Sequence, residues 1–341
     1  MNANAPIAAE RGTGSTGAAG GATLKRRAVE LLGRRPEMPI VAVTILLGVY
    51  FLNTAVDFGT SGNFGTLASF VAATAIIAVG ATLLMVSGEM DLSLGQTFAF
   101  SPLIFYYAHD AGLPLVLAVV VGVLACCLVG LLNGLVTTVI GISSFIVTLG
   151  TFFLLNGLNL VISDGTPKTT PGEGTFARVM GGGTYAALLW AVGFMVVLQL
   201  VLTKTRAGSH TIATGGNMLG ASEAGIKVRW VKIRAFMLAS AFAGFAGILE
   251  AVRVTSIDPL AGGPTLTFQA ISAIVIGGTL LTGGSGTVIG SFVGAVFLGV
   301  LRDGFTLAGV NAFAFDLIVG VAIIVAMILT VGIGRLRRGF R

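Results

Sequence analysis

Two acidic side chains stand in the segment GEMDLSLG at residues 88–95, which lies between two long apolar runs. Carboxylates in such a place serve as a buried proton relay, as part of a path for a solute, or as a cap at a helix start. Asp91 precedes Ser93 by two residues, a spacing at which its oxygen accepts the backbone N–H of Ser93 or Leu94. We therefore expect Gly88 to end one helix and Asp91 to cap the next. On this interpretation Glu89→Gln leaves function nearly unchanged, while path lining and a proton relay remain the alternatives.

Residues able to perform catalysis are sparse elsewhere. The segment GGSG at 283–286 matches the GxSG pattern of intramembrane serine proteases, in which a histidine on a neighbouring span activates the serine. The two histidines, His109 and His210, stand near a predicted span end and in a polar loop, so a glycine-rich helix end is the favoured interpretation of Ser285. Two histidines and two adjacent cysteines provide no metal-ligand cluster. We predict no catalytic residue, no bound cofactor and no metal site.

Composition indicates the setting in which these residues act. Of 341 residues, 55% are hydrophobic and 10% are charged, whereas a soluble domain carries about a quarter charged residues. Residues 111–163 and 259–301 contain no charged side chain. Since a helix needs about 20 apolar residues to cross the hydrocarbon, each stretch is long enough for two crossings. Spans in lipid must satisfy their own backbone groups, so the chain is predicted to be an all-α polytopic membrane protein. About ten transmembrane helices are expected, at 38–55, 66–87, 93–108, 114–138, 144–162, 184–203, 234–253, 267–282, 285–302 and 312–332.

Lysine and arginine gather before the first predicted span, after the last, and between the sixth and seventh. Positive charge favours the cytoplasmic side, and ten spans place all three clusters and both termini there. The net charge of +6 is therefore attributed to orientation and not to nucleic-acid binding. Residues 1–37 are expected to form a disordered cytoplasmic tail, 38–334 the transmembrane domain, and 335–341 a basic cytoplasmic tail.

The longest polar segment between predicted spans covers residues 204–234. Its centre, NMLGASEAG, predicts a short helix from about 217 to 224, with Asn217 as N-cap and Gly225 as the stop. Small residues such as Ala221 would let this helix seat in a groove on a partner. The alternative is a solvated loop whose charges fix orientation alone.

Two segments of the chain resemble each other. VGATLLMVSGEMDLSLGQTF at 79–98 is similar to IGGTLLTGGSGTVIGSF at 276–292, with two or three residues dropped. Interrupted, glycine-rich spans in matching positions are typical of a translocation path. Glycines at these positions would also permit close helix packing without lining any path.

These motifs resemble those of the permease subunits of bacterial ATP-binding-cassette (ABC) importers of the ribose/xylose/branched-chain group. GEMDLSLG is similar to the family's GGIDLSVG, SFIVTLGT at 144–151 to PFIVTLGT, and IGGTLLTGGSGTVIG at 276–290 to IGGTSLxGGxGTxxG. ATGGNMLGASEAGIKVRWVKI at 213–233 matches a stretch with GGN, paired alanines and SGI. The matches run from about residue 66 to 332. Glu89 departs from the pattern by replacing a glycine, and Met218 and Leu219 occupy positions that are often acidic.

The resemblance implies a type II-like ABC permease fold in the bacterial cytoplasmic (inner) membrane, embedded in membrane lipid. It implies a second permease copy, in a homodimer or a related heterodimer, an extracytoplasmic substrate-binding protein, and separate ABC ATPase subunits that use ATP and Mg. The chain has no GxxxxGK[ST] phosphate loop, which agrees with a subunit that is not itself an enzyme. A monosaccharide or polyol is the expected substrate. A nucleoside or branched-chain amino-acid permease is the alternative, followed by an ion-coupled secondary transporter.

The resemblance also assigns residues by position. The ATPase-coupling segment comprises Gly215, Gly216, Asn217, Ala221, Glu223 and Gly225. The translocation path or gate comprises Asp91, Leu92, Ser93, Gly277, Gly278, Gly283, Gly284 and Gly286.

Overall fold

The computed structural model describes residues 37–311, 314–315, 317–325 and 328. Most of these residues are helical, and they include one short antiparallel pair of strands, β1 (Lys168–Thr169) and β2 (Ser256–Ile257). The helices are α2 (Met38–Thr54), α3 (Ser61–Val86), α4 (Leu94–Asp110), α5 (Leu115–Leu135), α6 (Ser144–Ser163), α7 (Gly174–Ala177), α8 (Ala186–Lys204), α9 (Arg206–Gly216), α10 (Met218–Glu223), α11 (Val228–Val254), α12 (Gly263–Ile276) and α13 (Val288–Leu307). Two π-helical turns, Val136–Ile140 and Arg178–Gly182, follow α5 and α7.

Six helices among the described residues are long and apolar enough to cross a membrane: α3, α5 with its π-helical turn, α6, α8, α11 and α13. The apolar helices α2 and α12 have 17 and 14 residues, and α4 has 17. At 1.5 Å per residue, α12 is about 21 Å long, which is less than the hydrocarbon thickness of about 30 Å. The chain is therefore a helical, multi-pass membrane protein, while ten spans and cytoplasmic termini stay predictions. The expected tails at 1–36 and 335–341, and parts of the span at 312–332, lie outside the described residues.

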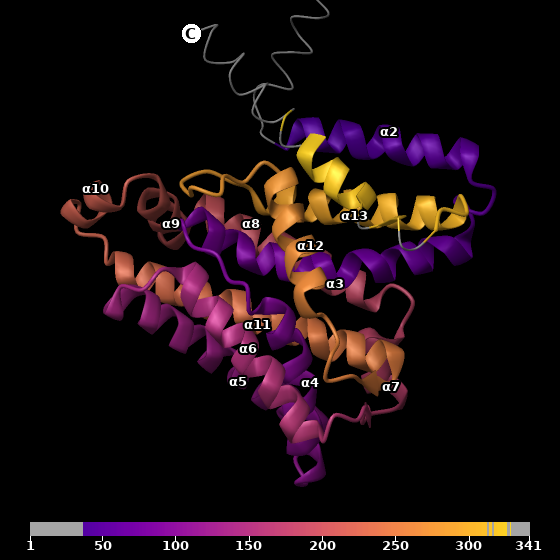
Figure 1. Ribbon diagram of the computed structural model, residues 1–341, viewed down its shortest axis with the longest axis horizontal. Helices are drawn as coiled ribbons and strands as arrows, with labels where there is room; N and C mark the ends of the chain where they lie inside the picture. The colour runs from indigo at the N-terminus through magenta and orange to yellow at the C-terminus, as the bar shows by residue number, and fades with distance from the viewer. Residues whose placement is uncertain (1–36, 312–313, 316, 326–327, 329–341) are drawn as a thin grey trace, which may run out of the picture.

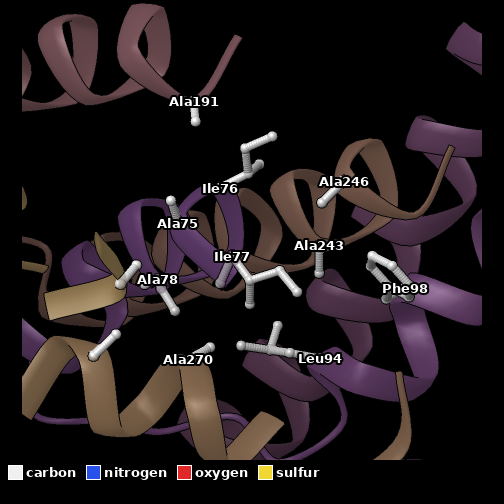
Figure 2. Close-up of a cluster of buried hydrophobic side chains, with 14 of the residues drawn as sticks. Ala75, Ile76, Ile77, Ala78, Leu94, Phe98, Ala191, Ala243, Ala246 and Ala270 are labelled. Atoms are coloured by element: carbon white, nitrogen blue, oxygen red, sulfur yellow. The ribbon is translucent and has the colours of Figure 1, made fainter. Parts of the chain in front are cut away.

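Helix α3 forms the centre of the packing. In its most apolar window 83% of the residues are buried, compared with 17% in α6. Figure 2 shows Ala75, Ile76, Ile77 and Ala78 of α3 surrounded by side chains from α4, α8, α11 and α12, many of them alanines. Small side chains let helix backbones approach closely, which is how helices pack in lipid where hydrophobic exclusion is weak.

The two ends of the molecule differ in the elements they carry. Helices α9 and α10 lie together at the left of Figure 1, and α7 lies near the opposite end. Helices α5 and α6 run side by side along the lower edge of the same view, and much of their apolar surface is exposed. In a membrane protein such surface faces lipid or another subunit. The polar elements therefore gather at the ends, as the charge pattern predicts.

Three expectations from the sequence are corrected. The segment 277–287 is not helical, although the predicted spans 267–282 and 285–302 covered most of it, because Gly278, Gly283 and Gly284 have positive φ angles of 90°, 82° and 77°. The segment 204–234 contains two helices and the start of a third, where we expected one.

The internal resemblance is wrong in register, because residues 79–86 continue α3 whereas the matched residues from 277 onward have left α12. The two helix ends are nevertheless alike. Glu89 N–H donates to the carbonyl of Leu84, and Thr279 N–H to that of Ile274, each across a glycine with positive φ.

Candidate functional site

The carboxylate of Asp91 is buried and fully engaged. Its Oδ1 accepts the backbone N–H of Ser93 at 2.8 Å, as predicted, and the Ser93 hydroxyl at 2.5 Å. The N-cap residue of α4 is Ser93, which makes no side-chain capping hydrogen bond, so Asp91 holds the turn before the helix and does not cap it. The amide of Asn133, on α5, donates to Ser93 Oγ at 3.2 Å and lies 3.4 Å from Asp91 Oδ2. Asn133 Oδ1 in turn accepts the hydroxyl of Thr151, on α6, at 2.6 Å. Asp91 thus anchors a polar network that joins α4, α5 and α6.

A second set of hydrogen bonds joins the start of α4 to α12 and α6. The N–H of Gly95 donates to Thr267 Oγ1 at 2.9 Å, and the N–H of Leu92 donates to Thr148 Oγ1 at 3.0 Å. A Cβ atom at Gly95 would lie 2.0 Å from the carbonyl oxygen of Gly263, so the first turns of α4 and α12 meet backbone to backbone. Two helix starts therefore converge near the buried side chain of Asp91.

The predicted coupling and path glycines come together at one junction, although they are far apart in sequence. The end of α9, the end of α3 and the turn at 282–284 approach through their backbones. Gly284 N–H donates to the carbonyl of Val86 at 2.8 Å. A Cβ at Gly215 would lie 1.9 Å from that carbonyl oxygen, and one at Gly283 would lie 2.7 Å from Cα of Gly88. We call this contact of residues 86–88, 215–216 and 282–284 the glycine junction.

The short helix α10 follows the glycine junction directly. Asn217 caps it, as predicted, by accepting the N–H of Gly220 at 2.9 Å, and Gly225 has the predicted left-handed conformation with φ of 82°. Ala221 is buried, whereas Met218 and Leu219 are 51% and 73% exposed. Glu223 is exposed as well. The helix therefore presents an apolar, accessible face at the end of the molecule.

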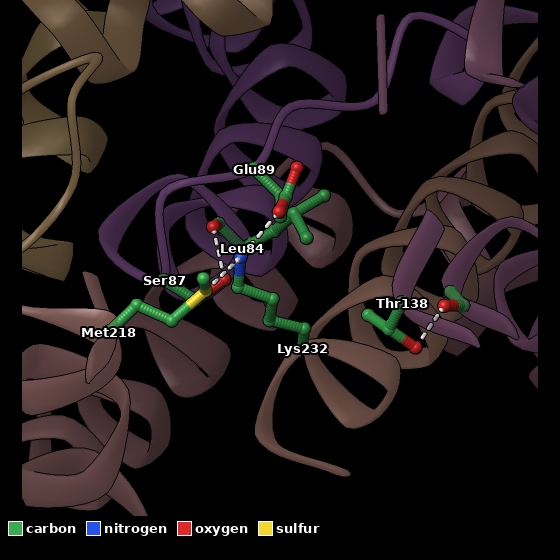
Figure 3. Close-up of polar contacts among 7 residues, drawn as sticks. Leu84, Ser87, Glu89, Thr138, Met218 and Lys232 are labelled. Carbon is green, nitrogen blue, oxygen red and sulfur yellow. Dashed lines mark hydrogen bonds and ion pairs between the residues drawn. The ribbon is translucent and has the colours of Figure 1, made fainter. Parts of the chain in front are cut away.

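An ion pair links α11 to the turn before α4, and its cation also contacts α10 (Figure 3). Lys232 Nζ, on α11, lies 2.6 Å from Glu89 Oε1, and each side chain is 13% exposed. The same Nζ lies 3.7 Å from the sulfur of Met218. Glu89 is therefore the partner of a cation and not a free acid, so we revise the expectation that Glu89→Gln is nearly neutral. The partner was not identified from the sequence because 143 residues separate it from Glu89.

The remaining path glycines take different places. Gly277 is buried against Gly290, since a Cβ there would lie 2.3 Å from the Gly290 carbonyl. Gly278 ends α12 with positive φ, and Gly286 packs against Thr279. Sequence reasoning missed Asn133, Thr148, Thr151, Thr267 and Lys232. Asn133 offered a signal, because it is an amide within the long uncharged stretch that crosses the membrane.

No arrangement for catalysis is seen in the part of the chain that the structure describes. His109 Nδ1 lies 2.9 Å from the carbonyl of Leu113, and no hydrogen bond joins either histidine to Ser285. Within the same residues, no group of three histidine, cysteine or acidic side chains could hold a metal ion. Apolar helices long enough to cross a membrane, with buried polar groups at their junctions, define a multi-pass membrane protein.

Comparison with known proteins identifies the family. The chain belongs to the family described as "Branched-chain amino acid transport system / permease component", whose model matches residues 63–327. It is 37% identical, over 87% of its length and 85% of the relative's, to the xylose/arabinose import permease protein of Sulfolobus acidocaldarius. It is 34% identical to the ribose import permease protein of Bacillus subtilis, over 76% of its own length and 81% of the relative's. It is 35% identical to the L-arabinose ABC transporter permease protein of Azospirillum brasilense, over 85% of its own length and 86% of the relative's. No solved structure matches the chain. The predicted resemblance to ABC import permeases is confirmed.

Proposed function

We propose that this chain is the transmembrane permease subunit of an ATP-driven importer of a monosaccharide or polyol. Its similarity to permeases named for xylose, arabinose and ribose supports a sugar as the substrate. We propose ten crossings with both termini in the cytoplasm, which places α9 and α10 on the cytoplasmic side together with the basic residues around them. The chain itself hydrolyses nothing; separate ABC ATPase subunits use ATP and Mg.

The glycine junction is the observation that carries the coupling mechanism. ATPase subunits that dock on α10 push on the end of α9, because Asn217 alone separates the two helices. Gly215 and Gly216 lie directly against the turns at 86–88 and 282–284, which we call the inner turns, with no side chain between them. A movement of α9 therefore displaces the residues around Gly88 and Gly283. Densely packed contacts transmit such displacements because they do not compress. In this proposal ATP binding moves both turns together.

The inner turns then form the gate of the path. Asp91 and Ser93 are buried between α4, α5 and α6, and Leu281 and Thr282 on the other turn are exposed. A second permease copy completes the path, and an extracytoplasmic substrate-binding protein delivers the solute to its outer end. Cysteine at position 281 should react with small thiol reagents in the nucleotide-free state, whereas cysteine at position 93 should be protected. Identical labelling of each site with and without ATP would contradict the gate.

The deciding experiment is reconstitution. The chain is coexpressed with ATPase subunits, purified, and incorporated into liposomes with ATP inside or outside. Radiolabelled xylose, arabinose and ribose are compared with leucine and uridine. ATP-dependent uptake of a pentose supports the proposal. Uptake of leucine or uridine alone would show that the substrate is an amino acid or a nucleoside and not a sugar. Uptake by the chain without any ATPase, driven by an ion gradient, would overturn it.

A further inference from the structure

A pocket lies beside α10, and the proposed coupling does not explain its basic lining. Its volume is about 750 Å³, and four segments line it: the turn before α4, the π-helical turn that follows α5, α10, and the start of α11 with the residues before it. Figure 3 shows four of the lining residues, Glu89, Thr138, Met218 and Lys232. A smaller neighbouring pocket of about 440 Å³ shares Lys227 and Trp230 with it and adds His210 and Arg234.

The pocket is positively charged. Lys227, Arg229 and Lys232 line it, and Glu89 is the one acid in its lining. Since Glu89 is paired with Lys232, the charges of Lys227 and Arg229 are left over. Within residues 37–311, no carboxylate forms an ion pair with either of these two cations, and both are exposed. Two uncompensated cations in a recess favour an anionic ligand.

The pocket is bordered by apolar and basic side chains of the kind that surround a bound lipid. On one side, the π-helical turn after α5 and the residues that follow it carry Val139, Ile140 and Ile142, which are 57%, 68% and 40% exposed. On the other side the basic start of α11 carries Trp230, which is 54% exposed. Tryptophan and basic residues are enriched where helices leave the hydrocarbon, and basic pockets between transmembrane helices on this side bind phospholipid head groups. Thr137, another lining residue, is 8% exposed, and its buried hydroxyl has no hydrogen-bond partner among the described residues.

We propose that this pocket binds the phosphodiester head group of an anionic phospholipid. Lys227 and Arg229 contact the phosphate, Trp230 covers the glycerol region, and the acyl chains lie along the exposed side of α5. A free phosphate ion would use the cations but would gain nothing from α5. An ATPase surface would need no acyl-facing helix beside the cations. The apolar border of the pocket therefore favours the lipid.

The chain offers its own reporter for a test. It contains two tryptophans, Trp190 on α8 and Trp230 in the pocket. In a Trp190→Phe background, fluorescence of Trp230 is measured in vesicles that contain phosphatidylglycerol or phosphatidylcholine with brominated chains. We expect stronger quenching by the brominated phosphatidylglycerol. Loss of the charges in Lys227→Gln/Arg229→Gln should lower the preference for it by about 25-fold, roughly five-fold per cation.

A matched control removes the same charge elsewhere. Lys168→Gln/Arg178→Gln changes two cations in the segment that contains β1 and α7, and its lipid preference should equal that of the parent. If Trp190→Phe does not fold, native mass spectrometry of the wild-type tryptophan background counts retained phosphatidylglycerol instead. An unchanged preference in Lys227→Gln/Arg229→Gln would overturn the proposal. The proposal would also be overturned if millimolar inorganic phosphate abolished the parent's preference for phosphatidylglycerol. It would likewise be overturned if Lys227→Gln/Arg229→Gln kept its lipid but no longer bound ATPase subunits.

Discussion

Glu89→Gln is the substitution whose effect the structure specifies best. Lys232 Nζ and Glu89 Oε1 are 2.6 Å apart, and both side chains are 13% exposed. At an effective dielectric constant of about 20, unit charges at this distance attract by about 6 kcal/mol, and the removal of both from water offsets most of that gain. The intact pair therefore contributes little net stability. Its interruption is costly, because it leaves one charge without its partner.

Breaking a buried ion pair by removing one charge costs about 3–5 kcal/mol. The pair borders a pocket, and the amide of glutamine still accepts a hydrogen bond from Lys232, so we expect a loss of about 2 kcal/mol in the free energy of unfolding. The assay is equilibrium unfolding in mixed detergent micelles, with the thermal midpoint as a second readout. ATP-driven uptake in liposomes should fall as well, because the pair holds α11 against the turn that precedes α4.

Two comparisons isolate the ion pair from other effects. Glu89→Gln/Lys232→Met removes both charges and should recover most of the lost stability, to within about 1 kcal/mol of the parent. Glu250→Gln interrupts a pair of the same length, but its side chains are 28% and 35% exposed. This control should cost less than about 1 kcal/mol. If Glu89→Gln is as stable as the parent, or if the two single substitutions are additive in the double variant, the reasoning is refuted.

Three further outcomes are expected. Gly215→Ala should lower the yield of folded protein and the thermal midpoint, because its Cβ would lie 1.9 Å from the Val86 carbonyl oxygen. Gly193→Ala is the control: its Cβ meets open space, so it should match the parent in both measurements. Asp91→Asn should keep uptake, because an amide oxygen still accepts both donors of Ser93, whereas Asp91→Leu should lose about 2–4 kcal/mol by leaving them unpaired; a stable Asp91→Asn without uptake would support a proton relay. Asn217→Ala removes a cap worth about 1 kcal/mol, so amide exchange in α10 should be roughly five-fold faster and ATP-driven uptake lower, with the chain still in the membrane; unchanged uptake would argue against docking at α10.

Local chemistry explains which features could be read from the sequence. The hydrogen bond from Ser93 N–H to Asp91 and the short helix capped by Asn217 depend on side chains within three residues of their partners, and both are present as predicted. Long apolar runs indicate membrane helices because hydrocarbon offers no partner to a backbone N–H. Helix ends inside glycine-rich segments were misjudged, since the φ angle of Gly278 or Gly283 is set by neighbouring backbones and not by its own residue type.

The sequence by itself determined the class of protein and its apolar helices, because composition and spacing are enough to choose between water and lipid. Tertiary structure alone decided what those elements do together. It paired Glu89 with Lys232, placed the amide of Asn133 on Ser93, and brought Gly215 against the turns at 86–88 and 282–284. These contacts join residues between 40 and 143 positions apart, and many chain paths could bring such residues together. Their choice depends on how closely whole helices pack, which is a property of the assembled molecule.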